Sequence, residues 1–62
     1  MIDLIQPYLK EIAIKTLDNE DEIYSCIPKD GIKVMPLGYF KTEQQAIEAF
    51  YIELIKKGYI NG

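Results

Sequence analysis

The sequence predicts an α+β fold in which a three-stranded antiparallel meander packs on one C-terminal helix, with a short apolar segment at the N-terminus. Residues 43–57 combine a helical apolar period with start and stop signals. Before them, short runs of β-branched and aromatic residues alternate with clusters of turn-forming residues. Since the chain has 62 residues and shows no linker-like stretch, we treat residues 1–62 as one small domain.

The C-terminal helix is predicted from Glu43 to Lys57. Thr42 can serve as its N-cap, because a threonine hydroxyl accepts a hydrogen bond from a free amide of the first turn. Glu43 suits the positive end of the helix dipole, and Lys56 and Lys57 suit the negative end. Gly58 follows as a stop, because glycine tolerates the left-handed backbone that ends many helices.

Two apolar sides are predicted on this helix. The residues of one side recur at helical spacing and are expected to face the core: Ala46, Ile47, Phe50 and Leu54. Ile52 and Ile55 lie on the other side of the helix, with Tyr51 between them. A single sheet layer covers only one side of a helix, so the second side needs another cover or a binding partner.

Two strands are predicted directly before the helix. Glu22–Ile27 is rich in β-branched and aromatic residues, and Pro28–Gly31 after it has the composition of a reversing turn. Ile32–Tyr39 is then interpreted as the third strand, returning beside the second. Pro36 cannot donate to a ladder, so we expect an irregularity or an edge at that point.

The first strand is predicted over Glu11–Leu17, where Ile12 and Ile14 alternate with polar residues. Residues 18–21, three of which are acidic, would form the turn that joins it to the second strand. A helix from Pro7 onward is the alternative for this region, because several apolar residues between 8 and 17 also fit a helical period.

The N-terminal residues Met1–Gln6 supply three further apolar side chains, Ile2, Leu4 and Ile5. A short helical turn in this segment could cover the second apolar side of the main helix. If it does not, that side is exposed, and Tyr51, Ile52, Ile55 and Tyr59 form a patch of the kind that binds a protein partner or a second copy of the chain.

The composition argues against catalysis, metal binding and cofactor binding. The chain has no histidine and one cysteine, Cys26, so it lacks both the histidine that would activate this thiol and the ligands of a His–Cys metal site. Cys26 is expected to be a small buried residue. Asp18, Glu20, Asp21 and Glu22 do not follow the calcium-loop pattern, because Lys29 stands where that pattern needs a glutamate. We interpret them as a solvated turn.

Membrane insertion and export are also not expected. No run of the sequence approaches the ~20 apolar residues of a membrane span. No basic start followed by an apolar stretch marks a signal peptide. The sequence therefore predicts a cytoplasmic protein without membrane contact.

Nucleic-acid binding is a second interpretation, and a less favoured one. The chain has a formal net charge of −3, and its cations are all lysines. Phosphate affinity comes from such cations, and five of them fall in the predicted sheet region: Lys10, Lys15, Lys29, Lys33 and Lys41. A third interpretation is an acidic inhibitor or decoy of the phage type, in which the acidic turn continues into a larger acidic surface with Asp30.

The segment Leu37–Phe50 resembles the L-G-x-F-x-T-x-x-x-A-x-x-A-Y junction of the APETALA-type DNA-binding domain, which also occurs in phage integrase arms and homing endonucleases. The resemblance implies three strands and a helix, with Tyr24 near the place of a strand-two tryptophan. That family reads DNA with arginine and tryptophan, and this chain has neither.

A looser similarity is to HicB-type antitoxins, and it rests on the spacing of five residues: Pro28, Gly38, Thr42, Ala46 and Gly58. This similarity implies a regulatory, antitoxin-like role. The L-P-G segment of that family is absent here.

Taken with the composition and the second apolar side of the helix, the preferred prediction is a non-enzymatic module that binds a protein or a second copy of itself.

Overall fold

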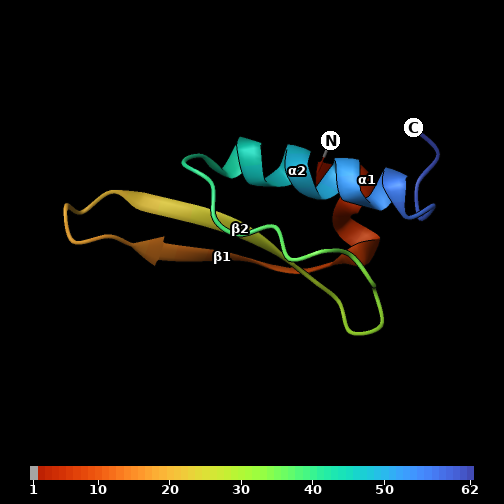
Figure 1. Cartoon of the computed structure of the whole chain (residues 1–62), viewed down its shortest axis with the longest axis horizontal. Helices are drawn as coiled ribbons and strands as arrows, with labels where there is room; N and C mark the ends of the chain where they lie inside the picture. The colour runs from red at the N-terminus through yellow and green to blue at the C-terminus, as the bar shows by residue number, and fades with distance from the viewer. Residues whose placement is uncertain (1) are drawn as a thin grey trace.

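The computed structural model describes residues 2–62 as an α+β fold. The elements in chain order are α1 (Ile2–Ile5), a 3₁₀ turn η1 (Gln6–Tyr8), β1 (Leu9–Thr16), β2 (Glu22–Pro28) and α2 (Glu43–Lys56). The two strands form an antiparallel hairpin, and α2 lies along one face of it with α1 behind (Figure 1). The tip of the hairpin projects beyond the start of α2, which makes the molecule elongated, at 38 × 20 × 17 Å.

Residues 8–17, for which the sequence allowed either a strand or a helix, contain the strand β1. This confirms the preferred interpretation. Leu9 lies opposite Pro28 and Glu11 opposite Ile27, so Lys10 between them has no partner and forms a β-bulge. The extra residue turns Leu9 to the same face as Ile12, which lies opposite Cys26. Without the bulge, Leu9 would share the outer face with Glu11.

The acidic turn joins β1 to β2 as expected. The amide of Leu17 donates to the carbonyl of Asp21 at 2.8 Å, and the amide of Glu20 donates to the carbonyl of Leu17 at 2.9 Å. The Asn19 side chain accepts from the amide of Asp21 at 3.1 Å. All residues from Leu17 to Glu22 are exposed, so the carboxylates of this turn are in water.

The prediction of a third strand is wrong: the described sheet has two strands. Residues 32–39 run back beside the hairpin without a ladder, and one isolated bridge remains, between Tyr24 and Phe40. Two residues explain this outcome. Pro36 has no amide to donate, and Gly38 has a φ of +73°, a left-handed conformation that interrupts an extended strand. Ile32, Val34 and Leu37 still pack against the core, half-buried.

The predicted helix is confirmed as α2, which ends one residue earlier than expected, at Lys56 with Lys57 as its C-cap. The Thr42 hydroxyl accepts from the amide of Gln45 at 3.1 Å, and the Gln45 side chain accepts from the amide of Thr42 at 3.3 Å. This reciprocal capping box satisfies two amides at the helix start. Gly58 has a φ of +85° just past the helix, as a stop signal requires.

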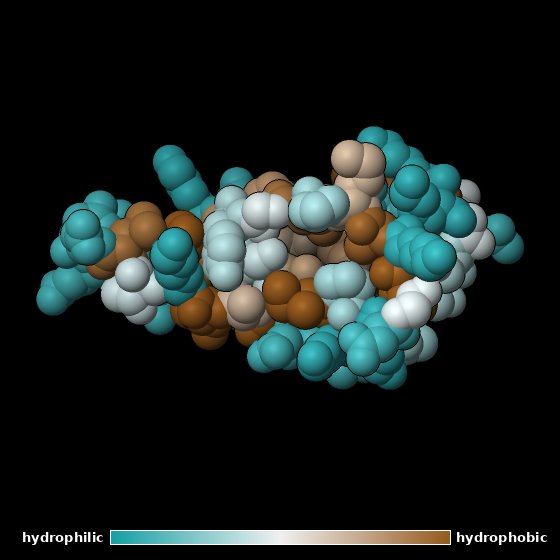
Figure 2. Space-filling model, turned by 60° about the horizontal axis from the view of Figure 1, so that its bottom comes forward, coloured by the Kyte–Doolittle hydropathy of each residue, from teal (hydrophilic) through white to brown (hydrophobic). Residues whose placement is uncertain are grey.

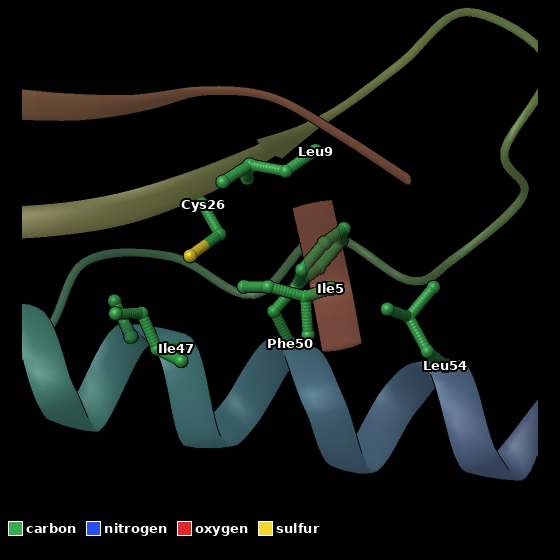
Figure 3. Close-up of a cluster of buried hydrophobic side chains, with 7 residues drawn as sticks. Ile5, Leu9, Cys26, Ile47, Phe50 and Leu54 are labelled. Carbon is green, nitrogen blue, oxygen red and sulfur yellow. The ribbon is translucent and has the colours of Figure 1, made fainter. Parts of the chain in front are cut away.

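The core forms where α2 meets β2 and α1. Ile47, Phe50 and Leu54 project from α2 toward the sheet, and the sulfur of Cys26 points back toward the helix (Figure 3). All four residues of the predicted apolar stripe are buried, which confirms that prediction. Ile5 of α1 is also fully buried among them, so the short N-terminal helix covers part of α2.

The N-terminal cover is only partial. Ile2–Ile5 is helical, as the sequence suggested, and it packs against α2 with Ile5 in the cluster formed by the core stripe. Met1 lies outside the described residues. Ile5 is buried, but Ile2 and Leu4 are exposed at the surface.

Neither helix of residues 2–62 has the length and apolar character that crossing a membrane requires.

Candidate functional site

The four predicted contact residues differ in how far the chain itself covers them. Ile52 is 50% exposed, whereas Tyr51, Ile55 and Tyr59 are half-buried. Tyr51 and Tyr59 pack against the core cluster. The C-terminal Gly62 lies so close to Ile55 that a Cβ on the glycine would come within 2.8 Å of the Ile55 side chain. Ile52 is thus the most accessible member of the predicted patch.

Tyr59 is held by contacts within the chain. Its hydroxyl accepts from the amide of Lys33 at 3.0 Å, and its carbonyl accepts from the Tyr8 hydroxyl at 3.0 Å. The two tyrosine rings are tilted by 51° with centroids 5.6 Å apart. These contacts tie η1, the residues after β2 and the C-terminal tail together. Tyr59 therefore has a structural role in the free protein.

A shallow groove surrounds Ile52, with a volume of about 460 Å³. It runs between α2 and the chain segment that leads into it. The apolar part of its lining consists of Tyr39, Phe40, Ala49 and Ile52, and the polar part consists of Lys41, Gln45 and Glu48. On α2, Gln45 and Ile52 each lie three or four positions from both Glu48 and Ala49, so the four residues share one side of the helix. Sequence reasoning found Ile52 but missed the wall formed by residues 39–41.

Cys26 lies beside a second cavity, of about 350 Å³, between β2 and residues 34–39. The side chain is buried, as predicted. Burial, and secondarily the charge of Glu43, raises the pKa of the Cys26 thiol from 9.0 to about 11. The thiol therefore stays protonated near neutral pH and is a poor nucleophile.

Metal binding finds no support in the charged side chains of residues 2–62. These residues contain no group of three acidic, cysteine or histidine side chains placed to hold a metal ion. Asp30 follows β2, at the opposite end of this strand from the acidic turn, so the two do not join into one acidic surface. Lys10 and Lys15 are on β1, and Lys15 Nζ lies 5.9 Å from the ring centroid of Tyr39.

The outer edge of β1 is a further surface that the sequence analysis did not single out. β1 pairs with β2 on one side, and in the described sheet nothing pairs with its other side. On the face of the molecule away from α2, apolar residues reach the surface in several places between hydrophilic ones (Figure 2). Along β1, Glu11 and Lys15 stand two residues before and two residues after Ala13, and they place opposite charges on one face of the strand.

Comparisons of the chain with protein-family models, with curated proteins and with solved structures found no match. The resemblances to the APETALA-type domain and to HicB-type antitoxins therefore stay predictions. The groove beside Ile52 and the open edge of β1 are the two candidate binding surfaces of the described structure.

Proposed function

We propose that this chain is a small non-enzymatic binding module that holds an apolar side chain of a partner protein in the groove around Ile52. One observation carries the proposal: Ile52 is 50% exposed in the C-terminal half of α2, where it lines the groove together with Phe40 and Ala49. A large apolar side chain so exposed at a hollow is unfavourable in water, and burying it against a partner removes that unfavourable exposure.

The shape of the groove has a local cause. Ala49 occupies the helix position between the longer side chains of Gln45 and Ile52, and its single methyl group leaves a hollow on α2. Phe40 closes one side and is fixed in place by its two backbone bonds to Tyr24, both 2.7 Å. The hollow is therefore shaped before a partner arrives, which reduces the entropy cost of binding.

The rim of the groove indicates the kind of partner. Lys41 and Glu48 are exposed there and carry opposite charges. The side-chain N–H groups of Gln45 can donate to a partner, while its oxygen accepts from the Thr42 amide. A peptide backbone has both donors and acceptors and no net charge, so it suits this rim better than a phosphate chain does. The fitting ligand is a polypeptide segment with one aliphatic or aromatic anchor residue.

A phage-displayed library of random linear peptides provides the probe. Panning on the immobilised protein should enrich peptides with a shared apolar residue. Such a peptide, made synthetically, should shift the amide resonances of Phe40 and Ala49. Ile52→Lys should weaken its binding by about tenfold or more, which corresponds to ~1.4 kcal/mol.

The matched control is Leu4→Lys, because Leu4 is also a large exposed apolar residue, 54% exposed, but lies on α1 outside the groove. It should leave peptide binding unchanged. If no peptide family is enriched, or if Ile52→Lys and Leu4→Lys weaken binding equally, the groove is not the binding site.

A further inference from the structure

We propose that a second copy of this chain pairs antiparallel with the open edge of β1, about a two-fold axis at Ala13. Among residues 2–62, β1 has a strand neighbour on one side only. An open edge presents unpaired N–H and C=O groups, which are a template for another strand. The resulting four-stranded sheet would have the two copies of β1 at its centre.

The direction of the backbone groups at this edge follows from the bonds of Tyr24. Its amide and its carbonyl both bond to Phe40, at 2.7 Å each, so they point away from β1. Ile14, which lies opposite Tyr24, is therefore in a pair without mutual hydrogen bonds, and its own N–H and C=O point to the open edge. The same holds for Ile12, two residues earlier in the strand.

This direction restricts the registers that a second copy can adopt. A regular antiparallel pair requires residues with outward-pointing groups to lie opposite each other. With the two-fold axis at Ala13, Ile12 of each copy lies opposite Ile14 of the other, and each such pair exchanges both backbone bonds. An axis between two residues would set an outward-pointing residue opposite an inward-pointing one, which excludes that register.

The charges select among the permitted registers. With the axis at Ala13, Glu11 of each copy lies opposite Lys15 of the other, which gives two opposite-charge pairs on the outer face. An axis at Ile12 would place Glu11 opposite Ala13, and an axis at Ile14 would place it opposite Leu17. Glu11 and Lys15 are exposed, and no salt bridge among residues 2–62 includes either of them. Lys15 can therefore turn from Tyr39 toward the second copy.

The apolar side chains of β1 support the same arrangement. Ile12 and Ile14 share a face with Cys26 and Tyr24, because they lie opposite these residues in the hairpin. The packing of α2 is on β2, so Ile14 stays 56% exposed in the single chain. Pairing at Ala13 brings Ile12 and Ile14 of both copies together at the centre of the sheet, where each covers part of its neighbour.

Charge reversal tests the proposed register by sedimentation equilibrium at low ionic strength. Wild-type protein should form dimers as its concentration rises. Glu11→Lys and Lys15→Glu each put like charges opposite each other twice per dimer, so either change should raise the dissociation constant by about tenfold. An equimolar mixture of these two variants should form heterodimers, and the double variant Glu11→Lys/Lys15→Glu should dimerise as the wild type does.

The matched controls reverse the charge at exposed residues of the turn after β2, Lys29→Glu and Asp30→Lys, and should leave dimerisation unchanged. A wild type that is monomeric up to millimolar concentration overturns the proposal. So does a dimer that both single variants form as well as the wild type does. A dimer that is insensitive to these changes but is lost in Ile52→Lys would place the self-contact at the groove instead.

Discussion

The two edges of the sheet differ in whether another segment of the chain covers them. The outer edge of β2 is covered by residues 32–40, which hold it by the bridge between Tyr24 and Phe40 and by apolar contacts with the core. The outer edge of β1 has no such cover in the described structure. The comparison shows that one bridge and a few packed side chains close an edge without a regular strand, and that β1 lacks even these.

The largest loss of stability is expected from truncating Phe50, which lies on the covered side of the molecule, the side where α2 packs on β2. Phe50 projects from α2 and is fully buried in the same cluster as Ile5 and Cys26 (Figure 3). Phe50→Ala should cost about 3–5 kcal/mol, because it removes buried apolar area and leaves a cavity. Domains of 62 residues typically have a total stability of roughly 3–9 kcal/mol, so the variant should lose at least about a third of its stability.

The open side supplies the contrast to this prediction. Ile14→Ala at the exposed end of β1 should change the free energy of unfolding by about 0.5 kcal/mol or less at concentrations where the chain is a monomer. Urea unfolding followed by circular dichroism measures both variants. Equal losses of stability in the two would contradict the difference between the covered and the open side.

A smaller effect is expected at the start of α2, beside the segment that covers β2. Thr42→Ala removes the hydroxyl that accepts from the Gln45 amide at 3.1 Å. Its expected cost is about 1 kcal/mol, within the usual range for helix N-caps. Thr42→Ser keeps the acceptor and should retain most of the stability, so a serine variant as unstable as the alanine variant would refute the capping role.

Alkaline pH should loosen the same covered side through Cys26. The folded protein raises the pKa of this thiol from 9.0 to about 11, so the folded state holds the proton more tightly than the unfolded state does. The stability that this thiol contributes is therefore complete below pH 9 and is lost as the pH rises toward about 11.

The control for this pH dependence is Cys26→Ala, which removes the thiol and keeps a small apolar side chain. Urea unfolding at a series of pH values should show a steeper alkaline loss of stability in the wild type than in this variant. Parallel curves for the two proteins would mean that the thiol does not take part. Other groups that titrate in this range are present in both proteins and cancel in the comparison.

The parts of the fold that were predictable from the sequence are those set by local signals. The limits of α2 follow from the capping box at Thr42 and the stop at Gly58, and its buried stripe follows from helical spacing. The loss of the third strand was not predictable in this way. Ile32–Tyr39 has strand-forming residues, and the left-handed conformation of Gly38, which interrupts the segment together with Pro36, is seen only in the structure. The bulge at Lys10 explains why Leu9 and Ile12 had helical spacing inside a strand.

The candidate surfaces were predictable only in part. Ile52 could be found because its position on α2 falls outside the core stripe. The coverage of Tyr59 by Tyr8 and Lys33 depends on segments far apart in the sequence, so no local pattern signals it. The opposite wall of the groove likewise requires the path of residues 39–41 beside α2. The open edge of β1 depends on what lies beside the strand in space, which the strand's own sequence does not specify.

Amide hydrogen exchange at single residues, measured by NMR over a range of protein concentrations, tests the account of the two edges most directly. In dilute solution the amides of Tyr24 and Phe40 should exchange slowly, because they bond to each other's carbonyls at 2.7 Å. The amides of Ile12 and Ile14 should exchange fast in dilute solution and slow down as the concentration rises and a second copy covers them. Amides at Ile12 and Ile14 that exchange at one rate across all concentrations would contradict the proposed pairing, and slow exchange there in dilute solution would contradict the open edge itself.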